Sequence, residues 1–315
     1  MITSKYHYHH IDNVWIYIQT SDQLVQNSVL QEVNQFSVVV VSKDFNPEKY
    51  ETLSKIFVKI YSKTGEIQRL LSYYLSVLIT GSFSVSEDLQ NNCQKFNFDD
   101  YESMEAIHSK TGIKSVIKMF GLDIILIYTA LVLKKRIAVY HHRLETLLQL
   151  IRVLPALVWH RKDCFESLYP CIDISCGQEM NELQTRSHFI AGFLESDVEN
   201  RNDLYDIYVN LAAVEITVSH TSKEVFQMTK THKEIAVFMT RQADNPSNSD
   251  VDVVREICDK NIELIKNLKI MANINEELES GSDRQRITLE ALKQKKLNHN
   301  LETFLWNLAV AENLV

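Results

Sequence analysis

The segment from residue 131 to residue 161 gathers the side chains of this chain that could most readily do chemistry. Three cations at 134–136 could bind phosphate, and His141 and His142 could bind a metal ion or transfer protons. Neighbours in a strand point to opposite faces, so two histidines at the end of a strand over 137–140 cannot easily share one ion. No Asp or Glu lies at a spacing that would orient either ring. We therefore expect the histidines to mark the end of a surface strand.

The basic triplet at 134–136 has a second interpretation, which we favour. It follows the apolar run "IILIYTALVL" at 124–133 and precedes a β-branched segment. This order is typical of a solvated turn that ends a buried helix. The aliphatic stems of the lysines would then pack at the edge of the core.

Other possible sites are weaker. Cys164, Cys171 and Cys176, with His160 and His188 nearby, could form a zinc site, but their spacing lacks the paired C-x2-C that makes such a signal specific. The sequence contains no G-x-G-x-x-G, P-loop, G-x-S-x-G or H-E-x-x-H motif. We expect no catalytic, cofactor-binding or metal-binding residues and no cofactor. The sequence favours a binding or regulatory protein over an enzyme.

Composition narrows the class of protein further. The 315 residues carry a formal net charge of −8, which disfavours nucleic acid as the main partner. The longest uninterrupted apolar run has ten residues, short of the roughly 18 that a membrane span needs, and the N-terminus lacks the apolar core of a signal peptide. An odd number of cysteines, five, suits reduced thiols. We therefore expect a cytoplasmic protein without a transmembrane segment.

Hydrophobic periodicity predicts an α/β protein with two lobes and a helical tail. Residues 14–20 and 36–42 are β-branched and aromatic, as strands are, and two amphipathic helices follow them. Residues 81–111 are polar and poorly periodic, so we expect a linker with at most short local structure. Strands and helices then alternate up to about residue 218. From 219 onward the periodicity is helical.

Several segments resemble the DENN domain family. The order of a leucine-rich helix, "KKRIAVY", a second leucine-rich helix and "LPALVWHRKD" is similar to its central module. "HFIAGF" at 188–193 and "LYDIYVNLAAVEIT" at 204–217 are similar to the segments that follow, and matching blocks run from about residue 36 to residue 312.

The resemblance implies a tripartite fold. Residues 1–80 would form a longin-like α/β lobe that is N-terminally incomplete, because its first recognisable strand corresponds to a position inside that lobe. Residues 81–111 would be the linker, residues 112–218 a central Rossmann-like α/β lobe, and residues 219–315 a helical part.

The resemblance also implies a function. DENN proteins act mainly as guanine-nucleotide exchange factors for Rab GTPases, and the similar branch is associated with late endosomes and secretory vesicles. The GTPase would lie across the groove between the longin-like and central lobes, and exchange would need no acid, base or metal from this protein. The expected partner-binding residues are Lys135, Tyr140, His141, His142 and Arg143.

An alternative of a different class stays open. The chain would then be a non-catalytic adaptor with a DENN fold, a subunit of a Commander-type endosomal recycling assembly that binds its coiled-coil subunits. Under either hypothesis we expect a protein peripheral to late endosomal membranes.

Overall fold

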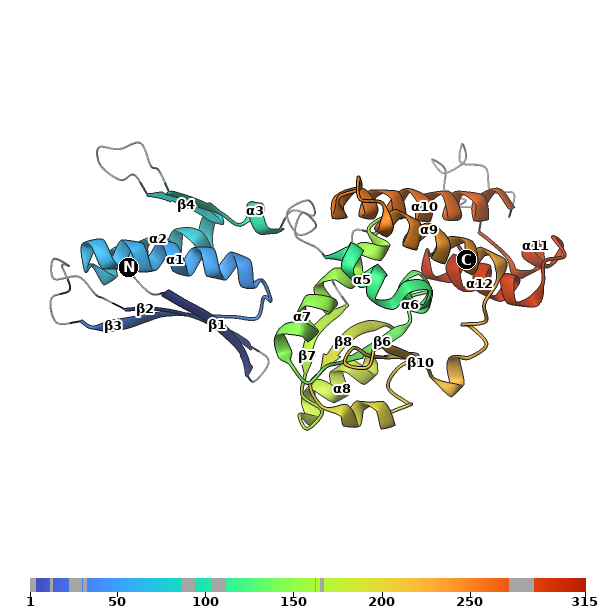
Figure 1. Ribbon diagram of the computed structural model, residues 1–315, viewed down its shortest axis with the longest axis horizontal. Coiled ribbons are helices and arrows are strands. Elements are labelled where there is room, and N and C mark those ends of the chain that lie inside the picture. Colours follow the sequence, from blue (N-terminus) through green and yellow to red (C-terminus); the bar gives the residue numbers. More distant parts are fainter. Residues whose placement is uncertain are drawn as a thin grey trace. The chain divides into compact units, whose positions relative to one another are not determined.

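The chain forms two compact units, Met1–Ile107 and His108–Val315, each with its own core (Figure 1). The computed structural model describes residues 4–11, 14–22, 30, 33–85, 94–102, 112–161, 163–164, 167–271 and 286–315. Both units combine helices with sheets, so the prediction of an α/β protein is confirmed.

The first unit is built on an antiparallel sheet of β1 (Ser4–Ile11), β2 (Val14–Asp22) and β3 (Gln35–Ser42), in that order. The helix α1 (Pro47–Thr64) covers one face. On that face the ring of Tyr17 stacks on Tyr50 with centroids 4.3 Å apart. Asn46 caps α1 by accepting the Lys49 N–H, and Pro47 is the first residue of the helix.

The structure differs from the sequence expectation within 81–111. After α2 (Ile67–Thr80), strands β4 (Ser82–Val85) and β5 (Gln94–Asn97) form a hairpin, followed by the short helix α3 (Asp99–Glu102). Phe83 and Phe96 lie opposite each other in the hairpin and are buried. Phe83 also contacts the rings of Phe57 and Tyr73. This part of the polar segment therefore belongs to the core of the first unit.

The second unit contains a five-stranded sheet in the order β10-β9-β6-β8-β7. The central strand β6 (Arg136–Tyr140) is parallel to β8 (Phe189–Phe193) and to β9 (Ile207–Asn210). The edge strand β7 (Leu168–Ile172) is parallel to β8, and β10 (Glu215–Val218) pairs antiparallel with β9.

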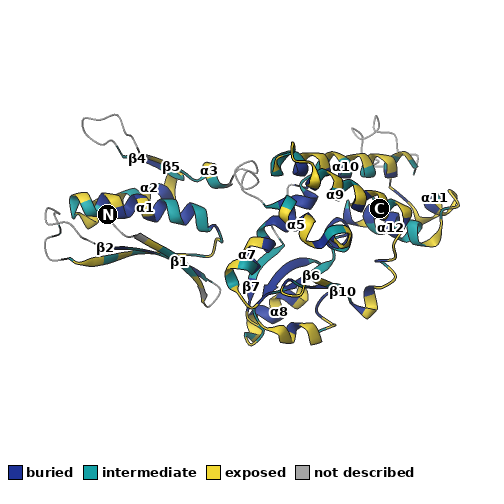
Figure 2. Ribbon diagram, in the orientation of Figure 1, coloured by how far each residue is buried: buried dark blue, intermediate teal, exposed yellow. Residues whose placement is uncertain are grey.

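Helices cover both faces of this sheet, and the residues at the centre of β6 are buried (Figure 2). Ile137 and Val139 face the larger core, whereas Ala138 faces a second core under α8 (Gly177–Thr185). The larger core is formed with the following helices: α5 (Ile113–Phe120), α6 (Ile124–Val132), α7 (Leu144–Val153), η2 (Leu154–Val158), α9 (Lys230–Asp244), α10 (Asp250–Met271), α11 (Leu289–Lys293) and α12 (His299–Ala311). The 3-10 helix η1 (Gly121–Asp123), which has no buried residue, links α5 to α6.

One helical stretch of the described chain, Ile113–Val132, is long and apolar enough to cross a membrane by length and composition alone, with a mean hydropathy of 1.9. The stretch is not an uninterrupted apolar run, because Lys114, Lys118 and Asp123 lie within it. The buried share of this window is 61%, and Gly121 breaks it with a 3-10 turn. Core helices of globular proteins meet the same criteria, and we interpret it as one.

Gly192 in β8 lies close to side chains of α7 and to the backbone of β7. A Cβ at this position would come within 2.3 Å of Ile151 Cδ1 and 2.4 Å of the Pro170 carbonyl oxygen. We therefore expect Gly192→Ala to destabilise the second unit by about 2 kcal/mol or more, measured by urea unfolding. Gly177→Ala is the matched control, because no atom lies within 4 Å of its added Cβ. Equal unfolding midpoints for the two variants would contradict this account.

His232 makes the stability of the C-terminal helices depend on pH. Its Nδ1 accepts the Thr229 N–H at the start of α9, and among the described residues its buried Nε2 has no hydrogen-bond partner. Burial lowers the His232 pKa to about 4. The folded state thus favours the neutral ring. The contribution of His232 to the unfolding free energy is therefore fully present above about pH 6.5 and is lost as the pH falls towards 4.

We expect the wild type to lose about 3 kcal/mol of unfolding free energy through His232 across that pH range. A His232→Gln variant keeps a polar side chain without the titration, so its unfolding free energy should change less with pH. Parallel pH profiles for wild type and variant would rule out this role for His232.

Candidate functional site

The strand β6 begins directly after the turn that ends α6. Lys134 has a φ of 49°, the left-handed conformation, while the Lys135 N–H bonds the Ala130 carbonyl at 2.8 Å and the Lys134 N–H bonds Leu131 at 3.2 Å. This pair of bonds is the Schellman ending of a helix, in which glycine usually holds the left-handed position. The basic triplet is therefore a helix-ending turn, as the sequence favoured.

Arg161 supplies further hydrogen bonds to the same helix end. Its guanidinium donates to the carbonyls of Leu131 at 2.8 Å and Val132 at 2.5 Å, and Nε donates to Glu312 Oε1 at 2.9 Å. Both charged side chains are largely buried. Burial alone would raise the pKa of Glu312, but the hydrogen bond from His160 and the charge of Arg161 outweigh it and lower that pKa.

A buried chain of hydrogen bonds extends from this ion pair to α10. The Tyr128 hydroxyl donates to Asn261 Oδ1 at 2.6 Å. The Asn261 amide then donates to the Leu157 carbonyl at 2.9 Å and lies 3.1 Å from His160 Nδ1. Because the amide donates there, Nδ1 accepts, and the His160 proton on Nε2 points to Glu312 Oε1 at 3.3 Å. The network joins α6, η2, α10 and the turn after α12.

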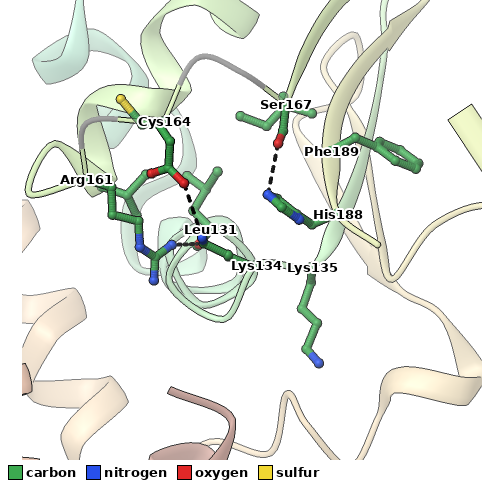
Figure 3. A pocket seen from close by; sticks show the side chains of 11 residues that line it. Leu131, Lys134, Lys135, Arg161, Cys164, Ser167, His188 and Phe189 are labelled. Atoms are coloured by element: carbon green, nitrogen blue, oxygen red, sulfur yellow. Dashed lines mark hydrogen bonds and ion pairs between the residues drawn. The ribbon is translucent and has the colours of Figure 1, made fainter. Parts of the chain in front are cut away.

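A small cavity of about 40 Å³ lies beside this turn (Figure 3). Its lining includes Lys134, which pairs with Asp163 at 3.3 Å, and Lys135. Ser167 and His188 point toward each other with 2.9 Å between Oγ and Nε2 (Figure 3). Burial lowers the pKa of His188, and the positive charges of Lys134 and Arg161 lower it further.

This arrangement does not suit catalysis. The cavity has room for about one water molecule, whereas small-molecule sites usually measure 300 Å³ or more. His188 Nδ1 faces the Ser187 hydroxyl at 3.2 Å, where a catalytic triad would have a carboxylate. The sequence spacing of Ser167 and His188 gave no indication that these two side chains are in contact.

The carboxyl end of β6 holds four of the five predicted binding residues. Tyr140 is half-buried, His141 is buried, and His142 and Arg143 are exposed. Neighbouring strands fix the backbone, since the Leu211 N–H bonds the Tyr140 carbonyl at 3.0 Å and the His141 N–H bonds the Phe193 carbonyl at 3.2 Å. This end of the strand therefore presents exposed side chains on a rigid base.

The expectation that the two histidines point to opposite faces is wrong. Their rings stack, with centroids 4.4 Å apart and planes 21° apart. Alternation holds only within a strand, and β6 ends at Tyr140, before either histidine. His141 Nδ1 accepts the Arg143 N–H at 2.9 Å. No group of three or more metal-ligating side chains occurs among the described residues, the histidine and cysteine candidates at 160–188 included.

The structure does not bring Lys135 together with the other four residues. Lys135 lies directly before β6, whereas Tyr140 is the last residue of that strand and residues 141–143 follow it. Roughly 15 Å of extended chain therefore separates Lys135 from the other four residues. The Lys135 ammonium group bonds Asn307 on α12 at 3.2 Å and is half-buried. Of the predicted residues, His142 and Arg143 are the side chains best placed to meet a partner.

A larger groove of about 640 Å³ lies between α9, α10 and α12 and contains none of the predicted residues. Its apolar lining comes from seven residues: Ile235, Phe238, Leu264, Ile270, Met271, Leu301 and Leu305. The charged side chains among its lining residues are Glu234, Lys260 and Glu263, and two of these already pair with each other at 2.7 Å. This groove offers no constellation for chemistry.

Comparison with known proteins identifies the class. A family model described as "SPA: Stabilization of polarity axis" matches residues 110–220. The chain is 38% identical to DENN domain-containing protein 10 of Danio rerio, over 96% of this chain and 82% of that protein. The Homo sapiens protein of that name is 36% identical over 96% and 81% of the two chains, and the Dictyostelium discoideum protein 36% over 99% and 86%.

These relatives are DENN domain proteins, the class that the sequence resembles. The chain belongs to the DENN domain-containing protein 10 family.

Removing the charge of Glu312 should weaken the second unit, because the buried Arg161 would lose its counter-charge. We expect Glu312→Gln to lower the unfolding free energy by about 3 kcal/mol at pH 7, measured by urea unfolding. Because the Glu312 pKa is lowered in the folded state, its stabilising effect is fully present above the pKa of the unfolded chain, 4.5. This stabilisation is lost as the pH falls below that value. The variant and the wild type should therefore converge in acid.

Glu290→Gln on α11 is the control for this prediction, since Glu290 is exposed and should change stability by less than about 0.5 kcal/mol. If Glu312→Gln matched this control at pH 7, the buried ion pair would not be stabilising the unit.

Proposed function

We propose that this protein is a regulator of Rab GTPases that promotes nucleotide exchange in late endosomal and secretory vesicle traffic. The proposal includes a tripartite DENN fold, with a longin-like lobe at 1–80, a linker, a central lobe at 112–218 and a helical part at 219–315. Membership of the DENN domain-containing protein 10 family supports it, as does the family-model match at residues 110–220.

Exchange by this protein would depend on differential binding. It would bind the nucleotide-free GTPase more tightly than the loaded form, and this difference in affinity would lower nucleotide retention. Holding the switch loops away from Mg²⁺ and the phosphates would be enough. Such a mechanism needs shape and a few fixed polar contacts. It needs no general base or nucleophile.

The observation that carries the proposal is the pair of exposed side chains, His142 and Arg143, at the carboxyl end of the central strand. Ligands of open parallel sheets bind at this end of the strands. The guanidinium of Arg143 could form charge-assisted hydrogen bonds with a carboxylate on a GTPase. The His141 N–H donates to β8 and the Tyr140 carbonyl accepts from the residue after β9, and these bonds hold the backbone that leads to Arg143.

A release assay with fluorescent GDP across a panel of Rab GTPases tests the proposal. We expect the wild type, at micromolar concentration, to accelerate release from at least one of them. Arg143→Glu should reduce that acceleration about tenfold or more, because repulsion would replace attraction in the contact with the nucleotide-free GTPase. Arg255→Glu is the matched control, an exposed charge reversal on α10 that should leave exchange unchanged.

Absence of acceleration for every Rab would refute the exchange function. Retention of the protein by coiled-coil subunits of a Commander-type assembly, together with that absence, would identify it as the non-catalytic adaptor. Lys135→Glu adds a separate measurement: its contact with Asn307 predicts a lower unfolding temperature, which Arg143→Glu should not show.

A further inference from the structure

The helix α2 of the first unit is apolar around most of its circumference. Arg69 is the one charged residue among its 14. One side packs into the unit, where Val77 is buried and Tyr73 contacts Phe83. A surface helix usually turns a charged face to water, with its apolar residues confined to one stripe. The outward side of α2 departs from this pattern.

Large aliphatic side chains cover that outward side. Their exposed fractions are 66% for Ile67, 55% for Leu71, 47% for Leu75, 59% for Leu78 and 80% for Ile79. Together they present roughly 500 Å² of apolar surface, near the top of the range for the largest patch on a typical monomer. Covering such an area would release a substantial hydrophobic free energy.

The order of these residues has two-fold symmetry. Ile67, Leu71, Leu75 and Ile79 are spaced by four, so they form one continuous ridge along the helix. The ridge has the same residue types, Ile-Leu-Leu-Ile, when followed from either end. Two such ridges related by a two-fold axis therefore place Leu71 of one copy opposite Leu75 of the other, and Ile67 opposite Ile79.

Charge does not oppose this pairing. At 100° per residue, Arg69 lies about 140° around the helix from the middle of the ridge. It also has an acidic neighbour, Glu66, with 3.8 Å between the charged atoms. No like charges would meet across the two-fold axis.

We propose that α2 is a self-association surface that binds α2 of a second copy of this chain across a two-fold axis. Packing of two ridges with a spacing of four crosses the helices at about −50°. The two copies would bury roughly 1,000 Å² in total, at the lower limit for a specific interface. Interfaces of this size belong mostly to weak, reversible complexes. The proposal does not depend on exchange activity.

Sedimentation equilibrium of the full chain, over a concentration range that spans micromolar, tests the proposal. We expect the mean mass to rise with concentration toward twice the 36.6 kDa of one chain. Leu71→Lys and Leu75→Glu should each raise the dissociation constant at least tenfold, because each buries two unpaired charges in the symmetric dimer. Both positions are exposed, so thermal unfolding of the variants should match the wild type.

Mixing the two variants gives the sharper result. In the proposed arrangement the introduced lysine of one chain faces the introduced glutamate of the other, while Leu75 and Leu71 still meet. The mixture should therefore dimerise, although neither variant does so alone. A parallel, in-register pairing would not bring the lysine and glutamate together and would give no rescue.

Arg69→Glu serves as the control on the same helix, since it changes a charge far around the helix from the ridge and should leave the dimer intact. A wild type that stays monomeric throughout the range would overturn the proposal. So would dimerisation of Leu71→Lys or Leu75→Glu alone, or a mixture of the two that stays monomeric.

Discussion

The second unit depends on how the buried carbonyl end of α6 is satisfied. The last carbonyl groups of a helix have no partner within it, and here they lie inside the protein. Arg161 donates to two of them, but a buried guanidinium itself requires a counter-charge. Glu312 provides this, and through His160 and Asn261 the same network reaches α10. One electrostatic requirement thus fixes a helix end, the start of the central strand and the C-terminal helices.

The consequence for function is a rigid strand whose two ends differ. The amino end lies in the network of buried ion pairs, and its lysines are engaged with Asp163 and Asn307. The carboxyl end carries exposed side chains on a backbone bonded from both sides. Such an end can offer shape and charge to a protein partner without providing a chemical group that reacts. This agrees with the proposed action on the conformation of a GTPase.

Local rules predicted the elements well, and long-range contacts explain what they missed. An Asn-Pro pair marks the start of α1, and Pro155 lies in the 3-10 helix that follows the end of α7. The hairpin of β4 and β5 could not be predicted, because its two buried phenylalanines are separated by a long polar stretch. Arg161 and Glu312 are 151 residues apart, so no spacing rule connects them.

The same limits apply to the site. The sequence located the strand and the exposed residues after it, but the stacking of His141 on His142 depends on where β6 stops pairing with its neighbours. The sequence predicted the helix-ending turn at Lys134, but not the left-handed conformation of the lysine, which has no sequence signature.

The sheet order also affects how the second unit is assembled during synthesis. The central strand β6 leaves the ribosome before β8 and β9, which flank it, and Arg161 appears long before Glu312. A nascent chain must therefore hold an apolar strand and an uncompensated arginine until distant segments arrive. We therefore expect this unit to fold only after its last segments have been synthesised. Its folding should be highly cooperative, because its long-range contacts must form at the same time. Chaperone protection of the emerging "RIAVY" segment would suit that order of events.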